Sequence, residues 1–210
     1  MSDTRIAVFS PGNGSNLQAL IDGVEAGDIA AEIKVVVSNR KDALSLERAR
    51  KHGIEPLYIT PVDCKDAVEY FNKVSKELEA RGINLICLAG FLLKISPEFI
   101  RKYKGRILNI HPALLPGFGG KGMYGHRVHE AVLESGVKFS GCTVHFVDEE
   151  YDRGPIITQR VVQVMDDDTA ETLASRVLVE EHKAYKEAVK LYVEGRLEIK
   201  GRRVVVKRDR

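Results

Sequence analysis

The sequence has 210 residues, of which 44% are hydrophobic and 30% charged. This composition is typical of a globular protein that buries a core without disulfides or metals. Its 32 basic and 30 acidic residues leave a net charge of +2, which argues against a general affinity for nucleic acids or membranes. The three cysteines, Cys64, Cys87 and Cys142, form no CxxC pair. Neither a zinc site nor a disulfide framework is therefore indicated.

The two ends of the sequence carry no targeting pattern. Residues 1–5 lack the features of a signal peptide, and no apolar run approaches the ~18 residues of a membrane span. We therefore expect a cytoplasmic protein. The basic stretch 200–210 is expected to be a solvated tail and not a binding patch.

Short apolar runs alternate with helical patterns through the first half of the chain. Strands are expected over 5–9, 33–38, 55–59 and 84–89, and helices from about 17 and 44, over 63–78 and after 96. In the third helix, Val68, Phe71, Val74 and Leu78 recur at steps of three to four residues and predict its buried face. The alternation predicts an α/β fold with a doubly wound, mostly parallel, Rossmann-like sheet.

The turn after the first strand is rich in glycine and reads SPGNGSNL over 10–17. Glycines let a backbone approach an anion, and the helix that follows offers unpaired N–H groups, so Gly14, Ser15, Asn16 and Leu17 are candidate phosphate-binding residues. The turn lacks the Lys of a Walker loop and the third glycine of GxGxxG. The alternative is an ordinary tight turn with an N-cap.

A second candidate segment follows the fourth strand. Phe91, Leu92, Leu93 and Ile95 are apolar although they stand where a loop is expected. They form either part of the core or the wall of a pocket for a flat apolar ligand.

The central apolar run 106–110 predicts a strand that stops at His111-Pro112. Alternation places Asn109 and His111 on one face, and ligands of open α/β sheets bind at the carboxyl ends of strands. The pair is therefore a candidate site. The alternative is a buried structural histidine beside a turn-forming asparagine.

The second half of the sequence has a mixed pattern. A glycine-rich, mobile loop is expected over 117–125, a helix over 127–134, strands over 139–147 and 156–164, a long helix from 168–169 to about 192, and a hairpin over 196–206. This part of the sheet is expected to be mixed or antiparallel. His126 and His129 are expected to lie on the surface of their helix.

An asparagine, a histidine and an aspartate without a marked nucleophile suit direct transfer between two bound substrates. An amide and an imidazolium can donate to an oxyanion, and a nearby carboxylate raises the pKa of the histidine and orients it. No set of side chains has the spacing of a metal site, and no metal is expected.

Several motifs resemble the phosphoribosylglycinamide formyltransferase family of folate-dependent enzymes over about residues 5–192. They are SPGNGSNLQALI at 10–21, SNR at 38–40, LAGFLLKIS at 88–96, LNIHPALLPGFGG at 108–120, GCTVHFVDEEYDRGPIITQ at 141–159 and EEHKAYKEAV at 180–189. The resemblance implies transfer of the formyl group of 10-formyltetrahydrofolate to glycinamide ribonucleotide in purine synthesis. The partners would be these two small molecules, with no nucleic acid or membrane, and the protein would be a monomer or a homodimer.

The resemblance also implies residue roles. Asn109 and His111 would polarise the formyl group, and Asp152 would hold His111 protonated. The ribonucleotide would be bound by Gly14, Ser15, Asn16, Leu17 and Glu181. The folate would be bound by Lys65, Leu92, Leu93, Lys94, Ile95, Asn109 and Asp148.

Two departures from the family pattern stand out. The loop after Pro116 is longer than in some members, and Lys65 stands where an arginine is often found. Lysine is a point charge and not a planar fork, so a contact at that position would be weaker or different.

We expect a single formyltransferase domain over 1–210, with a phosphate-binding half (about 1–105), a catalytic and folate half (about 106–195) and a C-terminal hairpin and tail (196–210). Two rivals use the same cofactor. A tRNA formyltransferase would need a C-terminal RNA-binding domain and a 10-formyltetrahydrofolate hydrolase an extra N-terminal domain, and we expect neither here. A third rival is a non-catalytic nucleotide-binding module.

Overall fold

The computed structural model describes residues 3–208. Met1 and Ser2, at the expected leaderless start, and Asp209 and Arg210, in the expected basic tail, lie outside the described residues. The chain divides into two compact units, the first ending at Leu108 and the second beginning at Asn109. The fold is α/β, with mostly parallel strands followed by antiparallel C-terminal strands, as the sequence predicts.

The first unit alternates strands and helices. Its elements are β1 (Arg5–Phe9), α1 (Ser15–Glu25), β2 (Glu32–Ser38), α2 (Leu44–Lys51), β3 (Glu55–Tyr58), α3 (Ala67–Ala80), β4 (Leu85–Leu88) and α4 (Pro97–Lys102). The four strands pair in parallel in the order β3-β2-β1-β4. In β1 and β4 almost every side chain is fully buried, as expected for parallel strands covered on both faces.

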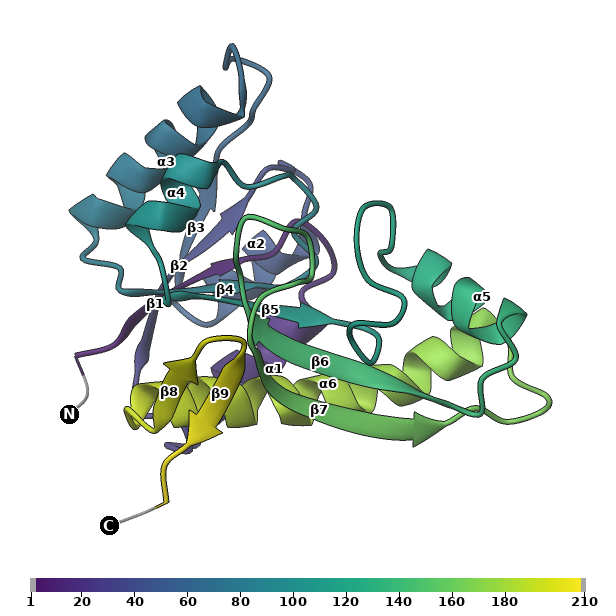
Figure 1. The fold of residues 1–210 in the computed structure, drawn as a ribbon. Helices are drawn as coiled ribbons and strands as arrows, with labels where there is room; N and C mark the ends of the chain where they lie inside the picture. The colour runs from purple at the N-terminus through teal and green to yellow at the C-terminus, as the bar shows by residue number, and fades with distance from the viewer. Residues whose placement is uncertain (1–2, 209–210) are drawn as a thin grey trace. The chain divides into compact units, whose positions relative to one another are not determined.

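An aromatic cluster fills the core between β1 and helices α3 and α4, which lie side by side in Figure 1. The rings of Phe9 and Phe91 meet edge to face at 5.2 Å, and Phe99 lies 5.0 Å from Phe71 and 4.7 Å from Tyr103. Phe91 and Ile95 are buried, whereas Leu92 is 55% exposed. The apolar segment 91–95 therefore belongs partly to the core.

Helix α3 begins at Ala67, four residues later than the sequence predicts. The Asp66 side chain accepts a hydrogen bond from the Glu69 N–H (2.8 Å), and the Glu69 carboxylate accepts one from the Lys65 N–H (2.9 Å). This reciprocal capping fixes the start of the helix. The predicted buried face is wrong at Val68, which is 37% exposed; Tyr70 is buried instead.

The second unit is built on an antiparallel ribbon. Strand β5 (Ile107–His111) crosses the boundary between the units, and it is followed by α5 (His126–Glu134), β6 (Phe139–Phe146), β7 (Ile156–Gln163), α6 (Ala170–Val193), β8 (Leu197–Lys200) and β9 (Arg203–Val206). β6 and β7 pair antiparallel over their length, and α6 packs along both (Figure 1). β8 and β9 form the predicted hairpin, which meets β7 where Ile156 pairs with Arg203.

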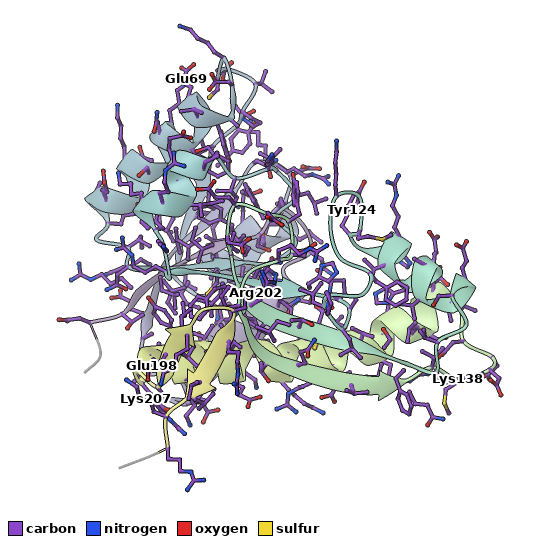
Figure 2. The ribbon with its side chains drawn as sticks, viewed as in Figure 1. Glu69, Tyr124, Lys138, Glu198, Arg202 and Lys207 are labelled. Carbon is purple, nitrogen blue, oxygen red and sulfur yellow. The ribbon has the colours of Figure 1, made fainter. Side chains whose placement is uncertain are left out.

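The hairpin also holds the loop between β6 and β7. Arg202, labelled in Figure 2, lies in the turn of the hairpin and donates a hydrogen bond to the Arg153 carbonyl (2.7 Å). Since Arg153 follows Asp152 directly, this contact ties the C-terminal hairpin to a segment that carries a candidate site residue.

Candidate functional site

Asn109 and His111 lie at the end of β5, which includes His111, one residue further than the strand predicted from the sequence. His111 is only 4% exposed, whereas Asn109 is half-buried. Pro112 follows directly and cannot donate to a sheet, so the strand ends here. The two side chains thus lie at the C-terminal end of a strand whose other residues are buried.

Asp152 reaches the same place from the loop between β6 and β7. Its backbone adopts the left-handed conformation (φ 54°), which aspartate tolerates better than most residues. A Cβ at Gly154 would stand 1.7 Å from the Phe146 carbonyl oxygen, so only glycine allows the loop to return so close to β6. The fold brings Asp152 Oδ2 to 3.7 Å from His111 Nδ1.

Sequence reasoning missed a fourth polar side chain, His145 on β6. His145 is 2% exposed, its Nε2 lies 3.1 Å from Asn109 Nδ2 and its Nδ1 lies 2.8 Å from the Phe146 carbonyl oxygen. Because a carbonyl only accepts, Nδ1 carries a ring proton. Nε2 lies between two groups, since it is also 3.7 Å from Asp152 Oδ1, and it accepts from the Asn109 amide when it carries no proton. This contact orients the amide and leaves its second N–H available to another acceptor.

The glycine-rich loop contacts both acid–base groups. His111 Nε2 donates a hydrogen bond to the Phe118 carbonyl (2.8 Å), and the Gly120 N–H donates one to Asp152 Oδ2 (2.9 Å). At Gly119 a Cβ would stand 2.5 Å from the Leu115 side chain and 3.2 Å from Asp152 Cβ. The glycine is therefore needed for this close approach. Beyond the loop, the guanidinium carbon of Arg127 in α5 lies 5.2 Å from the ring centroid of Tyr124; Tyr124 is labelled in Figure 2.

Burial lowers the pKa of His111, and the neighbouring His145 adds to this effect. The Asp152 carboxylate and the Phe118 carbonyl raise the pKa but do not overcome the burial. Asp152 thus acts on the His111 pKa in the predicted direction, but burial has the larger effect. Burial also raises the pKa of Asp152, but His145, His111 and the Gly120 N–H together bring it below its ordinary value. The site thus pairs a carboxylate with a readily deprotonated imidazole.

His129 was predicted to lie on the surface of its helix, and this prediction is wrong, because the residue is only 4% exposed. Its Nδ1 is buried and, among the described residues, accepts no hydrogen bond. Burial lowers its pKa to about 4, with smaller contributions from His126 and His111. The side chain of His126 is 61% exposed, as expected, and lies 3.9 Å from Glu171.

The glycine-rich turn before α1 belongs to the first unit. Gly14 is the N-cap of α1, with φ 79° and no side-chain cap. Within residues 3–208, the backbone N–H groups of Asn13, Gly14 and Ser15 have no hydrogen-bond acceptor. Leu17 is fully buried, so only its backbone could serve a ligand. The turn therefore presents donors from consecutive residues at the positive end of a helix dipole.

The remaining predicted residues are distributed over both units. Lys65 and Lys94 are exposed and Leu93 is half-buried, all in the first unit. Asp148, in the second, accepts a hydrogen bond from the Glu150 N–H (3.0 Å). Glu181 on α6 is 8% exposed, and its charge adds to the burial that raises the pKa of Cys142 to about 12.

A family model described as Formyl transferase matches residues 4–189 of the chain. This chain belongs to the formyl transferase family. Within that family it resembles proteins named for one substrate. The chloroplastic phosphoribosylglycinamide formyltransferase of Arabidopsis thaliana is 44% identical over 195 residues, which cover 92% of this chain and 66% of the relative.

Two further relatives agree. The trifunctional purine biosynthetic protein adenosine-3 of Homo sapiens is 42% identical over 93% of this chain and 19% of its own length. The crystal structure of glycinamide ribonucleotide transformylase 1 from Symbiobacterium toebii superimposes with a TM-score of 0.94 at 43% identity, covering 98% of this chain and 95% of that one. This formyl transferase chain thus spans less than two thirds of the curated relatives it matches. The resemblance inferred from its motifs is confirmed.

Among residues 3–208, no group of three or more His, Cys, Asp and Glu side chains is arranged to hold a metal ion. Over the same residues, no helix has the length and apolar character needed to cross a membrane.

Proposed function

We propose that this formyl transferase moves the formyl group of 10-formyltetrahydrofolate to the amino group of N1-(5-phospho-D-ribosyl)glycinamide, giving the N2-formyl product and tetrahydrofolate in de novo purine synthesis. The observation that carries the proposal is the convergence of Asn109, His111 and Asp152 at the end of β5, without a nucleophile among them, in a chain similar to enzymes named for this substrate. Both compounds act as substrates, and the proposal requires no metal.

Asn109 stabilises the charge that develops on the formyl oxygen. The amine attacks the formyl carbon, and the carbonyl oxygen becomes an oxyanion as the tetrahedral intermediate forms. The Asn109 amide donates one N–H to His145 and so has the other for the oxyanion. A donor fixed before the reaction stabilises the transition state without reorganisation. His145 supports this role by holding the amide in one orientation.

His111 moves the proton that the reaction releases. The attacking amine loses a proton as its C–N bond forms, and N10 of the folate gains one as its bond to the formyl carbon breaks. Burial favours the neutral imidazole, and only a neutral ring has a lone pair that can accept the first proton. Asp152, 3.7 Å away, stabilises the imidazolium while it lasts, and the imidazolium then protonates N10.

The binding roles follow the family resemblance and the donors in each unit. Gly14, Ser15, Asn16 and Leu17 would bind the ribonucleotide's phosphate, supported by the unpartnered N–H groups of the turn, and Glu181 its ribose or glycinamide end. The folate would be bound by Lys65, Leu92, Leu93, Lys94, Ile95, Asn109 and Asp148. The exposed Leu92 supports an apolar contact with the pterin.

We further propose that the two units act as halves of one formyltransferase domain, as a monomer or homodimer whose partners are its small-molecule substrates. The cytoplasm is the proposed compartment. Its support is chemical: Cys64, Cys87 and Cys142 are all free thiols, as is usual in a reducing environment.

Steady-state turnover of 10-formyltetrahydrofolate tests the proposal. The folate product is measured with and without the ribonucleotide, for the wild type and for His111→Ala. We expect turnover only with the ribonucleotide and a loss of about 10²–10³-fold in kcat in the variant. Turnover without the ribonucleotide would instead identify a hydrolase. Ribonucleotide binding without any turnover would identify a non-catalytic module.

A further inference from the structure

Helix α2 donates hydrogen bonds to backbone carbonyl oxygens of the glycine-rich turn in the first unit. The Ser45 side chain donates a hydrogen bond to the Ser10 carbonyl, and the Ser45 N–H donates one to the Gly12 carbonyl (3.1 Å). Arg48, one helical turn further along α2, donates through Nε to the Asn13 carbonyl (2.8 Å). Three carbonyls of the turn are thus bound to one helix.

This arrangement fixes the direction of the N–H groups in the turn. In a planar trans peptide, the C=O and the following N–H point in opposite directions. Since the Gly12 and Asn13 carbonyls point to α2, the N–H groups of Asn13 and Gly14 point away from it. These two N–H groups have no hydrogen-bond acceptor among the described residues. The contacts with α2 therefore set the direction in which the N–H groups proposed to bind phosphate point.

Arg48 contacts both the turn and helix α1. Besides the Asn13 carbonyl, its guanidinium donates to Asn13 Oδ1 (3.2 Å) and to Gln18 Oε1 (3.2 Å). A planar fork can make these three bonds at once, whereas an ammonium group on a flexible stem cannot hold the same geometry. Arg48 Cδ would also lie 3.2 Å from a Cβ at Gly14, so the arginine packs directly against the left-handed residue.

Gln18 connects Arg48 to further polar side chains. Its Nε2 donates to Asp22 (2.8 Å) and lies 3.1 Å from His52 Nε2, while His52 Nδ1 lies 2.7 Å from the Glu25 carboxylate. The Glu25 carboxylate accepts from His52 Nδ1, and the Gln18 oxygen accepts from Arg48. Arg48 thus joins the turn to a network of side chains from α1 and from the end of α2.

We infer that Arg48 is a positioning residue for the phosphate of the substrate: its guanidinium holds the Asn13–Gly14 peptide so that the turn presents its N–H groups to a phosphate dianion. The inference rests on the phosphate site of the proposed function. It assigns Arg48 no contact with the reacting atoms, so its loss weakens recognition of the phosphate and leaves the chemical step intact.

The first test measures binding of inorganic phosphate by calorimetric titration, which needs no turnover. Arg48→Ala removes the guanidinium contacts with the turn, and Arg48→Lys keeps the charge without the planar guanidinium. Arg50→Ala is the matched control, because it removes a charge from an exposed position on the same helix. We expect the Kd of phosphate to rise about tenfold in Arg48→Ala and several-fold in Arg48→Lys. The value in Arg50→Ala should stay within about twofold of the wild type.

The second test compares substrates with and without the phosphate. For Arg48→Ala we expect KM for the ribonucleotide to rise about tenfold, with kcat and the KM of the formyl donor within about twofold of the wild type. Glycinamide riboside, which lacks the phosphate, should be formylated with the same kcat/KM by both proteins. A general structural defect would lower activity on both substrates alike.

Three outcomes would overturn the inference: a wild type that binds no phosphate, an Arg48→Lys variant that binds phosphate as tightly as the wild type, and an equal loss on both substrates. Failure of the proposed formyl transfer is distinguishable from these. It would show as an inactive wild type, and the phosphate titration would still decide the role of Arg48.

Discussion

At the scale of single residues, Asp152 raises the pKa of His111 against the effect of burial. Its carboxylate is the largest influence that raises the His111 pKa against the effect of burial. In Asp152→Asn this influence is lost, so the His111 pKa should fall below its wild-type value, and kcat should fall about 10²–10³-fold as the imidazolium loses its counter-ion.

Titration of the His111 ring by ¹⁵N NMR measures the first effect independently of activity. Asp148→Asn, in the same loop, is the matched control and should leave the His111 pKa unchanged. An unaltered His111 pKa in Asp152→Asn would show that the carboxylate does not act on this ring.

His129 makes the stability of the protein depend on pH. Its folded-state pKa of about 4 lies below the ordinary value near 6.5, so between these pH values the unfolded chain binds a proton that the folded one does not. The free energy of unfolding therefore decreases as the pH falls through this window, by about 2 kcal/mol at pH 5. His129→Phe keeps a ring of similar size and should remove this part of the pH dependence.

Urea denaturation at pH 8 and pH 5 measures the difference. His126→Phe, on the exposed side of the same helix, serves as the control and should retain the wild-type dependence. Equal losses in His129→Phe and the wild type would contradict the assignment.

At the scale of elements, the start of α6 depends on a capping box. The Thr169 side chain accepts from the Thr172 N–H (3.3 Å), and the Thr172 hydroxyl accepts from the Thr169 N–H (2.9 Å). Thr169→Ala should lower the free energy of unfolding by about 1 kcal/mol. Ser175→Ala also deletes a hydroxyl from the helix, but at an exposed interior position where alanine is the better helix former, so it should be neutral or slightly stabilising. Thermal or urea unfolding of both variants checks the sign of each change.

The element boundaries show where sequence patterns are sufficient and where they fail. The strand predicted over 5–9 matches β1. Helix α3 begins four residues later than predicted because apolar spacing does not mark the start of a helix. The hydrogen bond from the Glu69 N–H to the Asp66 side chain marks it instead. Apolar patterns thus locate an element, and three-dimensional contacts fix its ends.

At the scale of the whole molecule, the sequence predicted the α/β class and three polar groups that converge in the second unit. It could not predict their environment. His145 was missed because a strand prediction does not say how many faces of the strand are covered, and seven of the eight residues of β6 are buried. A polar side chain between Val144 and Phe146 in a strand needs a partner once both faces are covered, and this signal would have found it. His129 was misplaced because its helix packs on α6, which no local pattern reveals.

Under the proposed function, the hydrogen bond from His111 to the Phe118 carbonyl affects how readily the formyl donor is lost to water. In this state Nε2 is engaged by the loop and Nδ1 faces Asp152, so the ring is not free to activate water. A ring held in this way would, under the proposed function, protect the formyl donor from hydrolysis by water. By the same reasoning, a compound that binds His111 Nε2 has to displace the Phe118 carbonyl.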